Sequence, residues 1–230
     1  MARRAIEITS GAAQIPAELY SPSGTASTGL VVLAHGTDGF EDNERGPWKT
    51  MIRGYAKKLA TAGLFALVPE YFKKTDTTPG VQAAELMMVK RDEWSAALTD
   101  CVSHAKRLPR VDSSRIGLLG FSLGGHLCLH IRAATKPKAL VEYFAPMLGG
   151  IGPAGTVPHA QIHHGTKDEL PLTKFSNAGA IELVLTREHT AVTLFPYTGA
   201  GHGFAGKDAA NTNARALSQT RTLQFFQTNI

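Results

Sequence analysis

A serine, an aspartate and a histidine each follow a separate segment that has the pattern of a buried β-strand: Ser122, Asp168 and His202. A serine hydroxyl is a poor nucleophile at neutral pH, and it needs a neighbouring base with a pKa of about 7, such as a histidine. An aspartate can hold the imidazole in one tautomer and stabilise it when it becomes charged. The three residue types therefore predict nucleophilic attack by Ser122, provided that the fold brings them together.

Ser122 stands in the segment Gly-Phe-Ser-Leu-Gly-Gly at residues 120–125, between a predicted strand and a predicted helix. The pattern G-x-S-x-G is typical of a turn so tight that strand and helix nearly touch, and a Cβ two residues before or after the serine would clash there. Such a turn directs the N–H of Leu123 into the site at a helix N-terminus. Composition alone yields roughly 0.1 matches to this pattern in such a chain, so its position between strand and helix makes it informative.

Attack on a carbonyl also requires hydrogen-bond donors for the oxygen that becomes negative, each typically worth about 3–4 kcal/mol. The N–H of Leu123 is one candidate. The loop after the predicted strand at residues 30–34 reads His-Gly-Thr-Asp-Gly at residues 35–39. We expect the N–H of Thr37 to be the second donor of this oxyanion hole.

Each of the three side chains has a plainer interpretation. Ser122 can be an ordinary turn serine, His202 a structural histidine and Asp168 a solvated loop residue. Other acidic residues also compete with Asp168 for the role of the third group: Asp38, Asp112, Glu142, Glu169 and Asp208. We favour Asp168 because it alone follows the penultimate predicted strand directly.

The elements that must position these groups alternate along the chain. Strands are predicted at residues 5–9, 17–21, 30–34, 64–69, 115–119, 139–144, 159–164 and 191–195. Helices are predicted at residues 47–61, 81–108, 123–134, within 172–186 and at 211–228. This order implies right-handed crossovers and an α/β fold with a mainly parallel, doubly wound sheet and helices on both faces. No linker divides the chain, so we expect a single domain at residues 1–230.

Composition excludes several classes of protein. The 230 residues are 43% hydrophobic and 19% charged, so the chain can bury a sizeable core and is not intrinsically disordered. A formal net charge of +5 is dilute, and basic pairs are scattered, so no nucleic-acid partner is expected. No apolar run is long enough to cross a bilayer, and no signal peptide is visible. We expect a cytoplasmic protein without a membrane partner.

Cysteine and histidine spacing gives no sign of a metal or a disulfide framework. Cys101 and Cys128 both lie in predicted helices and are expected to be reduced and buried. His126 and His130 are four residues apart on one predicted helix, but no third ligand accompanies them. We therefore predict no metal and no other cofactor.

Five stretches together resemble the dienelactone hydrolase family of α/β hydrolases: residues 34–36, 68–71, 120–125, 165–168 and 197–204. The resemblance extends from about residue 30 to 226, and the order of Ser122, Asp168 and His202 is that of α/β hydrolases. It implies an α/β-hydrolase fold, a Ser-His-Asp triad and an open site without a large cap domain. Two departures stand out. Family founders carry a cysteine at the position of Ser122 and a glutamate near Gly36.

These departures favour an ordinary serine-esterase mechanism, so we expect cleavage of small-molecule esters or lactones through an acyl-enzyme. Thioesterase, acyl transferase or peptidase-like use of the triad, or a non-catalytic binding protein, are alternatives, and a monomer or homodimer is expected. Lys73, Lys74 and Arg91 would favour a substrate that bears a carboxylate if they face the site. Aromatic residues that follow strand ends are expected to bind substrate: Phe40, Tyr71, Phe121, Phe144 and Phe204.

Overall fold

An eight-stranded sheet forms the centre of the computed structural model, which describes residues 1–230. The strand order is β1-β2-β4-β3-β5-β6-β7-β8. The strands are β1 (Ala2–Ser10), β2 (Ala13–Ser21), β3 (Thr28–Ala34), β4 (Phe65–Pro69), β5 (Val111–Phe121), β6 (Ala139–Tyr143), β7 (His159–Gly165) and β8 (Ala191–Tyr197). From β4 to β8 all neighbours pair in parallel, whereas β1 and β2 add an antiparallel edge. The predicted fold class is confirmed.

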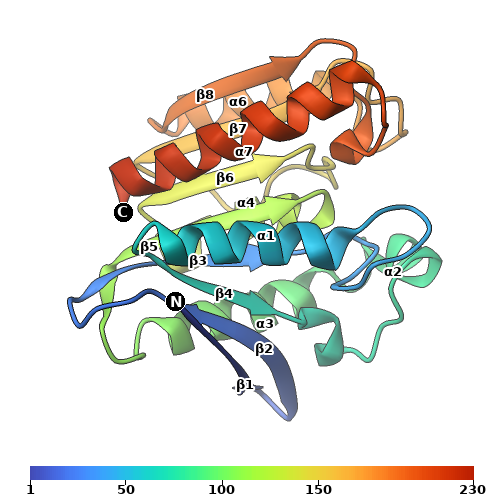
Figure 1. Ribbon diagram of the computed structural model, residues 1–230. Helices are drawn as coiled ribbons and strands as arrows, with labels where there is room; N and C mark the ends of the chain where they lie inside the picture. Colours follow the sequence, from blue (N-terminus) through green and yellow to red (C-terminus); the bar gives the residue numbers. More distant parts are fainter.

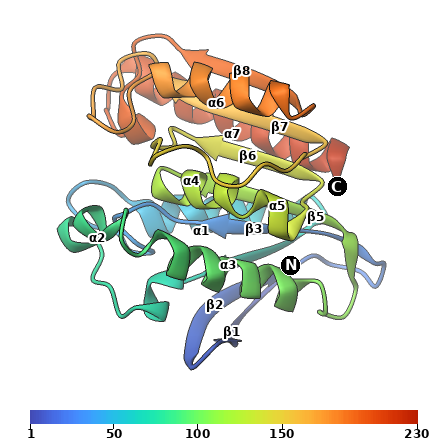
Figure 2. The ribbon, with the colours of Figure 1, turned by 180° about the vertical axis from the view of Figure 1, so that it is seen from behind.

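Helices cover both faces of the sheet (Figures 1 and 2). One face carries α1 (Trp48–Thr61) and α7 (Ala209–Asn229), and the other carries α3 (Arg91–Ala105), α4 (Leu123–His130) and α6 (Ser176–Arg187). Four short elements complete the chain: α2 (Val81–Leu86), α5 (Arg132–Thr135), η1 (Tyr71–Lys74) and η2 (His202–Phe204). None of the helices is both long enough and apolar enough to cross a membrane.

The central strands are apolar on both sides because each side meets a layer of helices. In β3, Val31 and Leu33 pack into the cluster beneath α1 and α7, whereas Leu30 and Val32 pack into the cluster beneath α3 and α4. Successive side chains of a strand point to opposite faces, so an unbroken apolar run is what such a strand requires. Each such buried side chain contributes about 1.5–3 kcal/mol to stability relative to its exposed state.

Two predicted helices are interrupted, and those predictions were wrong in their extent. The stretch at residues 81–108 divides into α2 and α3, separated by a turn at residues 87–90. The stretch at 123–134 divides into α4 and α5 around Ile131. Neither break contains Gly or Pro. In the first, tertiary packing overrides helix propensity, because Ala83 of α2 is buried and Met87 turns toward a cavity at the carboxyl edge of the sheet.

Candidate active site

Ser122 lies on the sharp turn between β5 and α4, at φ +53° and ψ −119°. A Cβ on Gly120 would lie 2.2 Å from the carbonyl oxygen of Gly124, and a Cβ on Gly124 would lie 2.2 Å from the carbonyl oxygen of Ala34. Both distances are far below van der Waals contact, so only glycine fits on either side of the serine. The geometry explains why the motif needs these residue types, and it projects Ser122 from the carboxyl edge of the sheet.

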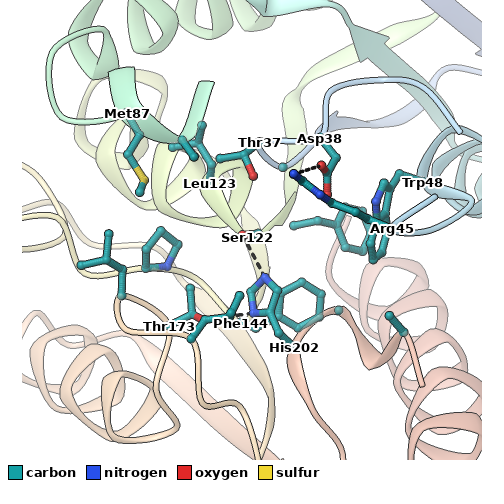
Figure 3. Close-up of a pocket in the computed structure, with 18 of the residues that line it drawn as sticks. Thr37, Asp38, Arg45, Trp48, Met87, Ser122, Leu123, Phe144, Thr173 and His202 are labelled. Atoms are coloured by element: carbon teal, nitrogen blue, oxygen red, sulfur yellow. Dashed lines mark hydrogen bonds and ion pairs between the residues drawn. The ribbon is translucent and has the colours of Figure 1, made fainter. Parts of the chain in front are cut away.

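Ser122, His202 and Asp168 meet at this edge from three separate loops, and Figure 3 shows the hydrogen bond between Ser122 and His202. His202 Nε2 lies 3.2 Å from Ser122 Oγ, and His202 Nδ1 lies 2.7 Å from Asp168 Oδ2. With the proton on Nδ1 donated to the carboxylate, Nε2 is free to accept the hydroxyl proton of Ser122. The arrangement can therefore move a proton away from the serine.

His202 is not the only group that donates a hydrogen bond to the Asp168 carboxylate. Burial favours its neutral form, but hydrogen bonds from His164 and His202 outweigh that effect and hold the pKa of Asp168 well below its usual range. Thr173 Oγ1 donates to Asp168 Oδ1 at 2.9 Å and lies 3.1 Å from His202 Nδ1. Asp168 is therefore charged at neutral pH and fixed in orientation.

His164 and Thr173 are the two contacts that sequence reasoning missed. The fully buried His164 places Nε2 3.2 Å from Asp168 Oδ2 and 2.7 Å from the carbonyl oxygen of Thr173. Burial favours neutral His164, but Asp168 and the buried Glu142 outweigh it and raise its pKa. Burial raises the pKa of Glu142 itself to about 7, although the Ala145 N–H donates to it at 2.9 Å. His164 thus contacts Asp168 directly and feels the charge of a second buried carboxyl group, Glu142, behind the site.

Thr37 and Leu123, the predicted oxyanion-hole residues, lie on the side of Ser122 away from His202 (Figure 3). The Thr37 N–H donates to no backbone carbonyl, and Leu123 is the first residue of α4, whose N–H has no acceptor within the helix. The Thr37 loop is fixed because its carbonyl accepts the Gly80 N–H at 2.8 Å. A Cβ at Gly36 would lie 3.3 Å from Ser122 Cβ, so this position leaves the space beside the serine free of side chain.

A cavity of about 580 Å³ opens above Ser122, and Figure 3 shows side chains that line it. Its wall includes Trp48, Met51, Ile52, Ala84, Met87, Phe121, Phe144, Pro146, Leu170, Pro171 and Leu172. This lining is mostly apolar, and the volume is within the usual range for small-molecule sites. No group of three or more His, Cys, Asp or Glu residues is arranged to hold a metal ion.

Of the five aromatic residues expected to bind substrate, only Phe121 and Phe144 line this cavity. Phe40 is buried and lies beneath the cations of Lys49 and Arg53 instead.

The Tyr71 ring is fully buried against His35, and its hydroxyl donates to the His35 carbonyl oxygen at 2.6 Å, so it supports the loop that leads to Thr37. Phe204 borders a neighbouring cavity of about 270 Å³. The predictions for Phe40, Tyr71 and Phe204 were wrong because a residue's place after a strand end determines neither the path of its loop nor the direction of its side chain.

Competing acidic residues lie in other settings. Asp112 bonds to Ser114, and Asp208 caps the N-terminus of α7. Glu169 is exposed, and Asp38 pairs with Arg45 at the cavity rim.

Three basic side chains that would favour a substrate carboxylate if they faced the site do not face it. Lys73, Lys74 and Arg91 do not line the cavity. Lys74 donates to the Ser10 carbonyl, and Arg91 pairs with Asp92. Cys101 and Cys128 are free and buried, as predicted.

Known proteins share this architecture. A protein of Synechocystis sp. provisionally named a carboxymethylenebutenolidase is 25% identical over 78% of this chain and 80% of its own length. A dienelactone hydrolase-like promiscuous phosphotriesterase from metagenomic libraries superposes with a TM-score of 0.80 at 21% identity, over 99% of this chain and 98% of that one. A thermophilic esterase of Thermogutta terrifontis superposes with a TM-score of 0.68 at 18% identity, over 96% and 91%. The family model described as "Dienelactone hydrolase family" matches residues 15–230. The chain therefore belongs to the dienelactone hydrolase family and is an ester-type hydrolase with the α/β-hydrolase fold.

Proposed function

We propose that the protein is a serine hydrolase that cleaves carboxylic esters or lactones through Ser122, His202 and Asp168, with an acyl-enzyme intermediate. The observation that carries this proposal is the continuous hydrogen-bonded path from Ser122 Oγ through both ring nitrogens of His202 to Asp168 Oδ2. A serine hydroxyl, a base within hydrogen-bond reach and a buried carboxylate behind that base are the three parts that acyl transfer requires.

In the first half of the reaction, Ser122 Oγ attacks the acyl carbon while its proton passes to His202 Nε2. The carbonyl electron pair moves onto the oxygen, where the N–H groups of Thr37 and Leu123 stabilise it. The C–O bond to the leaving group then breaks, and the imidazolium gives its proton to the departing alkoxide. In the second half, water attacks the acyl-enzyme and its proton passes to His202, which returns it to Ser122 as the acid leaves.

Ser122→Ala is the direct test. We expect a folded protein whose esterase activity on 4-nitrophenyl esters falls to background. A fluorophosphonate probe should add one label to the wild-type protein, and mass spectrometry of the digest should place it on Ser122. Full esterase activity in Ser122→Ala would refute Ser122 as the nucleophile. No labelling of the folded wild type would refute the proposal and favour a non-catalytic binding protein.

Hydrolysis of thioesters or amides would use the same three residues and would differ from ester hydrolysis only in the leaving group. The apolar cavity is compatible with esters, lactones and thioesters alike, so a matched panel of ester, thioester and amide substrates with one acyl group should rank them. We expect the ester to give the highest kcat/KM. A preference for the amide would assign the triad to peptidase-like chemistry instead.

A further inference from the structure

The cavity above Ser122 contains few charges. Among its 22 lining residues, only Asp38, Arg45 and His202 have ionisable acidic or basic side chains. His202 already bonds to Asp168 and Ser122. The electrostatic character of the cavity toward a substrate therefore depends on Asp38 and Arg45 alone.

Asp38 and Arg45 neutralise each other. Arg45 Nη1 donates to Asp38 Oδ1 at 3.0 Å, and Figure 3 shows the guanidinium reaching Asp38 at the edge of the cavity. Asp38 directly follows Thr37, the proposed oxyanion donor, so an unpaired carboxylate there would repel the developing negative charge. Arg45 offsets that repulsion, and the pair together leaves little net positive charge at the rim to attract a substrate anion.

Apolar surface flanks the nucleophile on two sides. In Figure 3, Trp48 and Met87 lie on opposite sides of Ser122. Trp48 belongs to α1, together with the neighbouring wall residues Met51 and Ile52. Met87 follows α2, and Leu170 adds a further apolar wall. Both the acyl group and the leaving group of a bound ester would therefore contact apolar side chains.

An anionic group in this cavity would lose hydration without gaining a free cation. Burial of an unpaired charge is strongly unfavourable, whereas apolar groups gain about 25 cal/mol for each Å² removed from water. Such a cavity would favour neutral, apolar groups over anionic ones.

We infer, building on the proposed function, that the substrates are neutral esters with apolar groups on both sides of the ester bond. The Asp38–Arg45 ion pair is the specificity determinant: it keeps the site neutral and excludes esters that carry a carboxylate. The acyl group that forms on Ser122 is consequently uncharged.

Two esters with acyl groups of the same length test this inference: neutral 4-nitrophenyl butyrate and the anionic mono-4-nitrophenyl succinate, each corrected for spontaneous hydrolysis. For the wild type we expect kcat/KM to be at least 100-fold higher for the butyrate. Asp38→Asn releases Arg45 from its partner, and we expect the ratio of succinate to butyrate activity to rise at least tenfold.

The double variant Asp38→Asn/Arg45→Gln is the matched control, because it removes the released cation and should return the ratio toward the wild-type value. Using a ratio on each variant cancels any general loss of activity, and circular dichroism checks folding. Equal wild-type rates on both esters, or an unchanged ratio in folded Asp38→Asn, would overturn the inference. Labelling of Ser122 by the fluorophosphonate in those same samples would show that the proposed function survives such a result. Absence of labelling would refute both the proposed function and the inference about its substrates.

Discussion

Two adjacent histidines on β7 are both fully buried, yet they differ in their hydrogen-bond partners and in the direction in which their pKa is shifted. His163 points beneath α7, where its Nδ1 lies 2.8 Å from the hydroxyl of Tyr197 and its Nε2 lies 3.1 Å from Gln161 Oε1. His164 points to the opposite face, toward Asp168 and Glu142. Burial lowers the pKa of His163 to about 3, assisted by the positive Arg221. The pKa of His164 is instead raised, because the carboxylates outweigh the same burial.

The difference shows that burial alone does not determine the charge of a histidine. On the α7 face, neutral partners make His163 a structural hydrogen-bonding group. On the other face, the acidic partners make His164 part of the support for the proposed triad. One residue of register along a strand separates the two roles, since successive side chains alternate between faces.

Asp168→Asn should have the largest effect, because it removes the group that His164 and His202 share. We expect kcat to fall about 10⁴-fold, as the imidazole loses its favoured tautomer and the partner for its charge. The pKa of His164, followed by NMR, should fall toward that of His163. Asp112→Asn, at a carboxylate that bonds to Ser114 near the start of β5, is the control and should leave both quantities unchanged. An unaltered kcat in Asp168→Asn would assign the acid to another residue.

His164→Leu should have the next largest effect. It removes the donor to Asp168 Oδ2 and to the Thr173 carbonyl, so both the carboxylate and the loop lose a fixed position. We expect a fall in kcat of about 10- to 100-fold, the scale of a misplacement near 1 Å, with KM little changed. His164→Gln retains a side-chain donor and should recover part of the loss. A kcat equal to that of the wild type in folded His164→Leu would contradict a positioning role.

His163→Phe is the matched change on the other face. It leaves the Tyr197 hydroxyl and Gln161 without their partner, and we expect the free energy of unfolding to fall by about 1–3 kcal/mol. Urea denaturation measures that loss. Activity at 25 °C should stay within a factor of three of wild type, and a larger fall in kcat would mean that the two faces are coupled.

The two histidines should make the free energy of unfolding depend on pH in opposite directions. Folded His163 resists the proton that the unfolded chain takes up below about pH 6.5, so its contribution is complete above that pH and falls by up to about 1.4 kcal/mol per unit toward pH 3. His164 binds its proton more tightly when folded, so its contribution is complete below its unfolded pKa and is lost as pH rises through the folded pKa.

Urea unfolding from pH 4 to 9 tests these signs. His163→Phe should flatten the acid side of the profile, and His164→Leu should flatten the side above pH 6.5. The same slope change in both variants would show that the two environments do not differ as described.

The sequence alone predicted the sheet because β3 and β4 are apolar on both faces, and it predicted the tight turn because Gly120 and Gly124 have a steric reason to be there. The alternation of side chains along a strand requires His163 and His164 to face opposite sides. The sequence did not predict what each one meets. The contacts of His164 depend on the loop that carries Asp168 and Thr173, and the path of that loop is set by tertiary packing.

The neutral ion pair at the cavity rim has a consequence for turnover. Hydrolysis of an uncharged ester generates a carboxylic acid that ionises in water, and Arg45 is already occupied by Asp38. The apolar walls that retain the reactant offer the newly charged fragment no counterion. The acid product should therefore dissociate readily and inhibit poorly, because the charge that hydrolysis creates weakens its binding to the cavity.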